Sequence, residues 1–303
     1  MSKKKLVLLF ILLLIATGLY LFNFKSHLQF ITDSDGEATN YQVKNQDVLH
    51  DNDEVLIRRI HIKRKDQSFA NRLINLLSRP TVYYLEFKQN NHDFTVAYYD
   101  EGSTAPSNVS DDTKFSVNSA FYNEDFEPNG LIIVDGKHYG RESRSSGHFK
   151  VIDGKAKAGP TSIFEDDSEA QYSCQSHPSV MKDGIIWDYI LNESMKEAYW
   201  GTKTYRSLVG QHENGNICFI LSGNGGLLSI KEISLIAKAN DIQTATCLDA
   251  GSALQYVYQD QDYKLSFSSM NNKLSLGTAV DKLSSRLIGK RFYSESPAFI
   301  NYQ

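Results

Sequence analysis

Residues 217–248 read ICFILSGNGGLLSIKEISLIAKANDIQTATCL, and the predicted fold depends on this segment. The first apolar run predicts a buried strand, which ends at the glycine-rich loop Gly-Asn-Gly-Gly. Ser229 and Glu232 then fit a capping box, and apolar residues recur at helical spacing up to about Asn240. A second strand is predicted at 243–248. The order of strand, glycine loop, helix and strand indicates a βαβ-like unit.

Most of the chain around this unit has the pattern of β-hairpins. Apolar runs are separated by four two-residue pairs: Asp135-Gly136, Asp153-Gly154, Asp183-Gly184 and Asn214-Gly215. Type I′ turns need positive φ at both central positions, which Asn-Gly and Asp-Gly supply most easily. Strands at 82–88 and 94–99 are predicted to form a further hairpin through Asn90-Asn91. We therefore predict an α+β fold, a β-rich mixed sheet domain with many hairpins and an embedded strand-helix-strand unit.

Residues 55–64 are predicted to form a half-buried strand with a basic face, because isoleucines alternate with Arg59, His61 and Lys63. Charge of this kind protects an exposed strand edge from aggregation. This interpretation is favoured over the alternative, a docking surface for a polyanionic glycan. A short helix is predicted at 68–77.

The N-terminus predicts a membrane segment. Three lysines precede an uncharged apolar run at 6–22. As a helix, this run would span about 25 Å, near the lower limit for crossing a bilayer. The lysines should stay in the cytoplasm, which places the rest of the chain outside. The length of the run and the lack of a small-x-small cleavage site favour an uncleaved signal anchor over a cleaved signal peptide.

The predicted organisation follows from these segments. It comprises a cytoplasmic tail (1–5), a transmembrane signal anchor (6–24), a polar stalk (25–52), the β-rich domain (53–291) and a peripheral C-terminal tail (292–303). We therefore expect a single-pass membrane protein. Its domain would lie outside the cytoplasm, either in the periplasm or at the cell surface. The alternative is secretion after signal cleavage.

Composition and cysteines narrow the function classes. The net charge of -4 gives no reason to expect nucleic-acid binding. Cys218 and Cys247 lie in strand-like runs, where they could pair across neighbouring strands or remain buried thiols. Cys174 is expected in a polar loop. No Cys-x-x-Cys pair occurs, which argues against a cysteine zinc site.

Polar residues at strand ends are the candidate site residues, because the backbone there is exposed to a ligand. Asp249 directly follows a predicted buried strand, so partial burial would raise its pKa. Its structural alternative is a turn residue that bonds the backbone two residues on. Arg206 begins another strand and could hold a phosphate through its planar guanidinium, although such an arginine is usually a surface residue. His148 and His177 are candidate proton donors.

Several short segments resemble the phosphodiester glycosidase family. Asn118-Ser119-Ala120-Phe121-Tyr122 is similar to the family's Asn-Gly-Gly-Tyr-Phe segment, and Leu248-Asp249-Ala250-Gly251-Ser252 to its Leu-Asp-Gly-Gly-Ser block. Further similar segments keep the family's order, at 128–136, 178–184, 206–210 and 229–237. The likeness covers roughly residues 82–258.

The resemblance implies a hydrolase that cleaves a sugar from a sugar-phosphate diester on an envelope or extracellular glycan. It suggests Asp249 as nucleophile or general base and Arg206 as the phosphate ligand. Asn118 and Ser252 would orient the sugar or phosphate. The predicted substrate-binding set is completed by Gly251, Glu124 and His177. Whether a second carboxylate joins as general acid is left open, the candidates being Glu124, Asp125 and Glu127.

The sequence departs from the family at three glycines, which are replaced by Ser119, Ala120 and Ala250. If those glycines provide positive φ or close substrate approach, the pocket here is narrower or differently shaped. The replaced glycines favour one alternative function, a non-catalytic glycan-binding module tethered to the membrane, which the intact polar residues oppose. A further alternative is a phosphodiesterase or transferase acting on phosphate-linked envelope polymers.

No cofactor is expected. Phosphate and several acids leave room for a divalent cation, but no ligand spacing requires one. The expected partners are the phosphate-linked glycan or glycoconjugate substrate and, through the N-terminal helix, the membrane.

Overall fold

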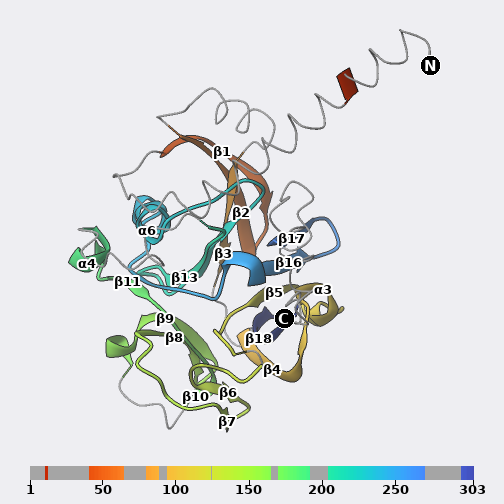
Figure 1. Cartoon of the computed structure of the whole chain (residues 1–303), viewed down its shortest axis with the longest axis vertical. Helices are drawn as coiled ribbons and strands as arrows, with labels where there is room; N and C mark the ends of the chain where they lie inside the picture. Colours follow the sequence, from red (N-terminus) through yellow and green to blue (C-terminus); the bar gives the residue numbers. More distant parts are fainter. Residues whose placement is uncertain are drawn as a thin grey trace.

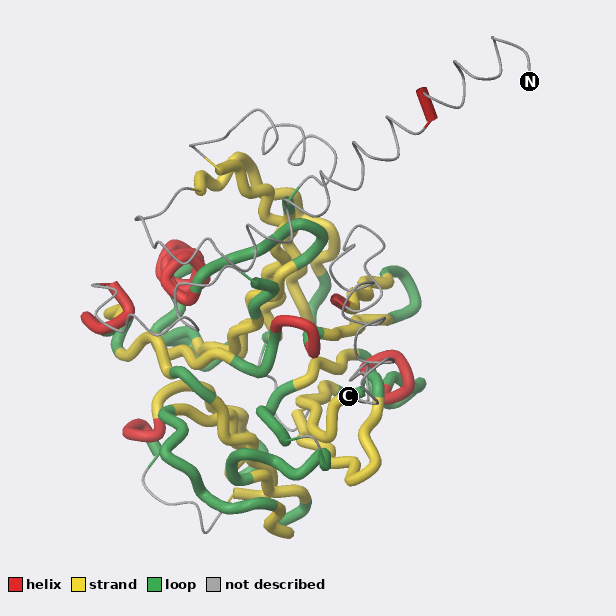
Figure 2. The backbone as a smooth tube through the Cα atoms, viewed as in Figure 1, coloured by secondary structure: helices red, strands yellow, loops and turns green. Residues whose placement is uncertain are grey.

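The computed structural model describes residues 11–12, 41–64, 80–88, 94–123, 125–164, 170–191, 204–269 and 295–303. Strands dominate this part of the chain and form three sheets with few helices (Figures 1 and 2). The predicted β-rich mixed architecture is confirmed. None of the helices described is long and apolar enough to cross a membrane. The predicted anchor lies outside the described residues except for 11–12, as does the whole of the predicted helix at 68–77.

The largest sheet has eight strands in the order β1-β2-β3-β14-β13-β15-β11-β12. They are β1 (Tyr41–Asp51), β2 (Val55–Arg64), β3 (Thr81–Phe87), β11 (Ser179–Lys182), β12 (Ile185–Ile186), β13 (Ser207–Gln211), β14 (Ile217–Ser222) and β15 (Thr244–Cys247). β13 pairs antiparallel with both β14 and β15, so these two strands run parallel to each other. Helix α6 (Ile230–Ala239) connects them. The strand-helix-strand unit is therefore confirmed, with β13 inserted between its two strands.

Two five-stranded sheets complete the fold (Figure 1). The first, ordered β7-β6-β10-β8-β9, contains β6 (Ile132–Val134), β7 (Lys137–Tyr139), β8 (Gly147–Ile152), β9 (Lys155–Pro160) and β10 (Ala170–Ser176). The second, ordered β17-β16-β5-β18-β4, contains β4 (Phe94–Ser103), β5 (Phe115–Asn118), β16 (Gln255–Gln259), β17 (Lys264–Ser268) and β18 (Ser296–Tyr302). The short helices are α3 (Ala105–Asn108), α4 (Asp188–Leu191), η1 (Thr161–Ile163) and η2 (Gly251–Ala253).

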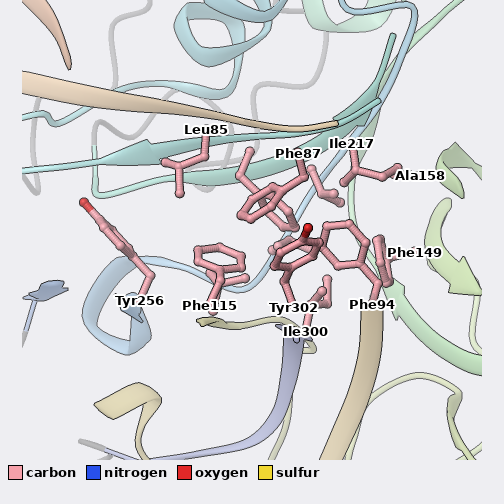
Figure 3. Packing of buried hydrophobic residues seen from close by; sticks show 14 of the residues in the cluster. Leu85, Phe87, Phe94, Phe115, Phe149, Ala158, Ile217, Tyr256, Ile300 and Tyr302 are labelled. Atoms are coloured by element: carbon pink, nitrogen blue, oxygen red, sulfur yellow. The ribbon is translucent and has the colours of Figure 1, made fainter. Parts of the chain in front are cut away.

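The three sheets meet in one aromatic core around Phe87 (Figure 3). Its ring lies 5.3 Å from that of Phe94 and 4.7 Å from that of Tyr302, measured between centroids. Alternate residues of β3 face opposite sides of the sheet: Leu85 and Phe87 enter this core, whereas Tyr84 packs in the cluster that α6 covers. The eight-stranded sheet is thus buried on both faces at its centre, and its strands there are apolar almost throughout.

The capping box and the glycine loop before α6 have structural roles. The Ser229 hydroxyl accepts from the N–H of Glu232 at 3.1 Å, and the Glu232 carboxylate accepts from the N–H of Ser229 at 2.8 Å. A Cβ on Gly226 would overlap the carbonyl oxygen of Thr81. The loop is therefore glycine-rich because its backbone packs directly against the start of β3.

Three of the four predicted two-residue turns have the expected geometry. Asp135-Gly136, Asp153-Gly154 and Asp183-Gly184 join antiparallel strands, and φ is positive at both residues of each pair. The turn between β13 and β14 differs, because only its Gly215 has positive φ, at 93°. There His212 and Asn216 close a wider loop through a backbone bond of 3.0 Å.

The predicted hairpin of residues 82–88 with 94–99 is wrong. β3 pairs with β2 and β14, whereas β4 pairs with β18 in a different sheet. Phe87 and Phe94, at facing ends of the two strands, instead meet edge to face inside the core. Because both rings are buried in this contact, β3 and β4 pack against each other from different sheets and do not pair as neighbours in one sheet.

Two segments expected outside the domain belong to it. Residues 41–51, assigned to the polar stalk, form edge strand β1, and residues 296–302, assigned to a peripheral tail, form β18. β18 is buried along its whole length between β5 and β4. β1 stays polar because it is an edge strand: Asp47 accepts from Arg59 at 3.0 Å and pairs with His61 at 2.9 Å. These pairs engage Arg59 and His61 of the basic face of β2 and favour the solvated-strand interpretation over glycan docking.

The cysteines are buried free thiols. Cys218 and Cys247 lie on β14 and β15, and β13 separates those strands, so the side-by-side arrangement required for a disulfide does not occur. Cys174 lies inside β10 and not in a polar loop. The alternation of β10 was obscured in the sequence because Ser173 and Gln175, on either side of it, are buried polar residues.

We expect Phe87→Ala to destabilise the protein by about 3–5 kcal/mol, because the fully buried Phe87 contacts rings of its own sheet and of the sheet that contains β4 and β18, and its removal leaves a cavity. Urea unfolding followed by circular dichroism measures this loss. The matched control is Val48→Ala, at a position that is 62% exposed, which should change stability by less than about 0.5 kcal/mol. Similar losses for the two variants would contradict the central position of Phe87.

Candidate active site

The topology brings the main candidate residues to one edge of the eight-stranded sheet. β14 and β15 are parallel, and both end at the edge where β13 begins. Arg206 precedes β13, Ser222 ends β14 and Asp249 follows β15. The N–H of Arg206 donates to the Ser222 hydroxyl at 2.8 Å, and the N–H of Ser222 donates to the Arg206 carbonyl at 2.9 Å. The carboxyl ends of parallel strands, where connections diverge, are where α/β sheets bind ligands.

Asp249 is held through its backbone. Its N–H donates to the Ser119 carbonyl at 2.9 Å. Its carbonyl accepts from the Asn118 amide at 3.0 Å and from the Ser207 hydroxyl at 3.1 Å. The carboxylate accepts from the N–H of the next residue, Ala250, at 2.9 Å, and not from two residues on. No other hydrogen bond to this carboxylate occurs within the described part of the chain, so it is available to a substrate.

The surroundings of Asp249 favour its neutral form. Burial raises the pKa of this carboxyl to about 7, although the hydrogen bond from Ala250 opposes the shift. The thiol of Cys174 lies nearby: burial raises the pKa of Cys174 to about 12, the Ser119 hydroxyl opposes this, and the charge of Asp249 adds to it. A carboxyl whose pKa lies near neutrality can exchange a proton at physiological pH.

Asn118 is a positioning residue in this structure. It is fully buried at the end of β5, and its amide nitrogen donates to the Asp249 carbonyl. Its amide oxygen accepts from the N–H of Gln255 at 2.9 Å. One side chain therefore holds both ends of the turn that contains η2. The expected role of orienting the sugar or phosphate directly stays a prediction, since both ends of the amide already bond the backbone.

Arg206 is buried, with 4% of its surface exposed, so the interpretation as an ordinary surface arginine is wrong. Its Nε donates to the Leu228 carbonyl at 3.2 Å, just before α6. The guanidinium also lies close enough to Cys247 to lower the pKa of that thiol, although burial outweighs this effect and the pKa rises to about 12. The site therefore holds a permanent positive charge beside the strand that leads to Asp249.

The remaining predicted residues are distributed around this edge. Gly251 has φ of +68°, which favours glycine, and its N–H donates to the Tyr205 carbonyl at 2.9 Å. Ser252 is exposed on η2. His177 precedes Pro178, whose carbonyl accepts from the N–H of Cys247, and its ring lies 3.2 Å from the Ser146 hydroxyl. Glu124 lies outside the described residues.

Two other predicted acid–base roles find no support here. His148 is fully buried on β8, and burial together with the charge of Lys150 lowers its pKa to about 3, so it is neutral at physiological pH. Asp125 and Glu127 are exposed in the turn around Phe126, where the N–H of Asp125 donates to the Asn123 amide oxygen and the Glu127 carboxylate accepts from the Asn123 amide nitrogen. Across the described ranges, no set of three or more His, Cys, Asp and Glu side chains is placed to hold a metal ion.

The replaced glycines do not require a special backbone. None of Ser119, Ala120 and Ala250 has positive φ. Ser119 and Ala120 are fully buried, and Ala120 belongs to the aromatic core. Any residue can therefore adopt the backbone conformation at these three positions. The replacements at Ser119 and Ala120 change the packing of the interior. Sequence reasoning missed Ser207, Ser222 and Cys174; only Ser222, which ends a strand before a glycine loop, carried the signal used for Asp249.

The fold and this edge define a β-rich domain with a carboxyl group and a buried arginine at the ends of two parallel strands. The family model described as Phosphodiester glycosidase matches residues 111–284, more than half of the chain. The protein therefore belongs to the phosphodiester glycosidase family, as the sequence segments predicted.

One solved structure agrees on the fold. The zebrafish N-acetylglucosamine-1-phosphodiester alpha-N-acetylglucosaminidase catalytic domain, auto-inhibited by its pro-peptide, matches with a TM-score of 0.56 and 12% identity, over 87% of this chain and 88% of that one. A hypothetical protein from Synechocystis matches with a TM-score of 0.48 and 10% identity, over 82% of this chain and 62% of that one. A search of curated proteins finds no significant match.

The raised pKa of Asp249 predicts a pH-dependent effect on stability. The folded state keeps a proton on this carboxyl up to about pH 7, whereas the unfolded chain loses it near pH 4. The folded state therefore binds more protons between these values, and this stabilising contribution is lost as the pH rises from about 4 to 7. Asp249→Asn should remove that dependence, so its stability relative to the unchanged protein should be higher at pH 8 than at pH 5.

Asp260→Asn is the matched control, because the pKa of Asp260 is shifted in the opposite direction to that of Asp249. Burial alone would raise the pKa of Asp260. Hydrogen bonds from Tyr258 and from the N–H groups of Tyr263 and Asp262 outweigh burial and hold this pKa below its usual value. The ionised carboxylate of Asp260 stabilises the folded state above about pH 4, and this stabilisation is lost at lower pH. Asp260→Asn should therefore destabilise the protein at both pH 5 and pH 8. Urea unfolding at pH 5 and pH 8 measures both variants. The same pH trend in the two would contradict the burial of the Asp249 carboxyl.

Proposed function

We propose that this protein hydrolyses a sugar-phosphate diester at the bond between the anomeric carbon and oxygen, with Asp249 as nucleophile or general base. The observation that carries the proposal is the carboxyl of Asp249, with a pKa of about 7, at the same sheet edge as the buried cation of Arg206. Family membership supports the reaction class, since the matching family is named for phosphodiester glycosidase activity.

The chemistry suits these two groups. Phosphate is already a good leaving group, so strong acid assistance is less necessary than for an ordinary glycoside. The site must supply stabilisation of charge and a positioned nucleophile or water. Ionised Asp249 would attack the anomeric carbon or deprotonate a water, and Arg206 would stabilise the departing phosphate. Water is consumed, and the products are a free sugar and a phosphomonoester.

The neighbouring residues would position these groups. Asn118 and Ser207 hold the backbone carbonyl of Asp249. The carboxylate of Asp249 would be oriented by the hydrogen bond that it accepts from the N–H of Ala250. Ser252, exposed on η2, and Gly251 would face the sugar or phosphate. His177 would approach from the side of β11. The substrate would be an envelope or extracellular glycan, reached from a membrane anchor at 6–24 or after secretion.

The decisive substitution is Asp249→Asn, which preserves the hydrogen bond to Ala250 but removes the ionisable group. The purified full chain is incubated with N-acetylglucosamine linked through phosphate to a chromogenic alcohol, the linkage named in the zebrafish relative. We expect sugar release from the unchanged protein and a loss of about a hundredfold or more in the variant. Asp153→Asn, in the remote turn between β8 and β9, should retain full release.

Solvent oxygen distinguishes the bond that breaks. In ¹⁸O-labelled water, a glycosidase places the label in the sugar, whereas a phosphodiesterase cutting at phosphorus places it in the phosphate. Label in the phosphate would support the alternative phosphodiesterase function. Full activity of Asp249→Asn would contradict the assigned residue, and no release from any sugar-1-phosphodiester tested, with or without divalent cations, would contradict the proposed activity.

A further inference from the structure

A cavity lies at the opposite end of the eight-stranded sheet from Asp249. It has a volume of about 650 Å³ and is lined by residues of β1, β2, β3, the turn between β13 and β14, and the end of α6. This turn is the end of the sheet away from Arg206 and Asp249, because β13 begins at the active-site edge and ends here. The volume falls within the range of small-molecule sites.

The floor of the cavity is fixed by hydrogen bonds. The hydroxyl of Tyr84 lies 2.9 Å from the Glu86 carboxylate and 2.7 Å from Nε2 of His212. Nδ1 of His212 lies 3.1 Å from the Asp241 carbonyl and is placed to donate to it. Burial raises the pKa of Tyr84 well above its ordinary value, so its phenol is not a nucleophile. The floor is therefore a fixed, hydrogen-bonded surface.

Polar groups that line this cavity lack protein partners. The guanidinium of Arg58 lies over the Tyr84 ring at 4.3 Å, and one of its terminal nitrogens donates to Gln46. Its Nε is buried and has no partner among the described residues. Asn240 is only 8% exposed; its amide nitrogen donates to the Ile236 carbonyl, but no bond to its amide oxygen is found in the part of the chain described. The amide oxygen of Asn240 therefore keeps its capacity to accept a hydrogen bond from a polar ligand in the cavity.

The lining of the cavity carries a net negative charge, which favours a cationic ligand. Glu86, Glu213 and Asp241 carry three negative charges against one permanent positive charge on Arg58. The carbonyl groups at the C-terminal end of α6 add further negative potential. Glu213 and Asp241 are exposed at the mouth, so they can meet a cationic group as it enters.

We propose that this cavity binds an amino sugar with a free, protonated amine. The ammonium group would pair with Glu213 and Asp241, and sugar hydroxyls would bond the amide oxygen of Asn240 and the terminal guanidinium nitrogens of Arg58. A neutral polyol satisfies only the second pair of contacts, and an anionic sugar is repelled by the acidic residues. The site is ancillary to Asp249 and does not depend on the proposed hydrolysis.

The test compares a glucosamine trisaccharide with its fully N-acetylated counterpart, which has the same ring but no charge. Isothermal titration calorimetry with the purified full chain at pH 6 measures both. We expect the free amine form to bind at least about tenfold more tightly, with affinity falling as salt is added. The double variant Glu213→Gln, Asp241→Asn should lose this preference. Asp241 has φ of +58°, a conformation that Asn also tolerates, so the fold should be kept.

Two control variants separate this site from the rest of the molecule. Asp153→Asn changes an aspartate with φ of +49° in another turn and should leave binding unchanged. Asp249→Asn should also leave it unchanged, which distinguishes this site from the active site. The proposal is overturned by equal affinity for the two trisaccharides, by no binding to either at millimolar concentration, or by loss of binding in Asp249→Asn.

Discussion

The site depends on the amide of Asn118, which joins two sheets at the point where Asp249 emerges. Asn118 ends β5 in one sheet, and its side chain bonds the Asp249 carbonyl, directly after a strand of the other. The same side chain accepts from Gln255, at the far end of the η2 turn. Loss of this amide would leave the buried N–H of Gln255 without its partner and the Asp249 carbonyl with the Ser207 hydroxyl alone, which is costly inside a protein. The carboxyl of Asp249 is therefore placed by tertiary packing as much as by its own strand.

Helix α6 gives the two ends of the large sheet different electrostatic character. Its N-terminal end lies next to Leu228, whose carbonyl bonds Arg206, and its C-terminal end borders the cavity that holds Asp241. Arg206 thus places a positive charge where a phosphate would be bound, and Asp241 a negative charge where we propose an ammonium group. A helix dipole favours anions at the first end and cations at the second. The parallel arrangement of β14 and β15 imposes this separation, because the helix between them must run back across the sheet.

The departures from the family's glycines bear on the interior of the protein. Ser119 and Ala120 are buried, and neither has a backbone conformation that needs glycine. Ser119 still supplies the carbonyl that accepts from the N–H of Asp249. The backbone contact that positions the carboxyl is therefore present with the substituted residues. The hydroxyl of Ser119 adds a polar group beside Cys174 where a glycine would leave space.

Local sequence determined the elements whose signals are contained within a few residues. The capping box at Ser229, the Asp-Gly turns and the position of Asp249 after a buried strand all follow from short-range geometry. Tertiary structure alone decided which strands pair, because a period of two specifies a strand but not its neighbour. Phe87 and Phe94 therefore face each other across the core in place of forming a hairpin, and the C-terminal strand β18 occupies the interior of a sheet. The burial of Arg206 and of Cys174 was likewise set by distant segments that pack over them, which no local pattern records.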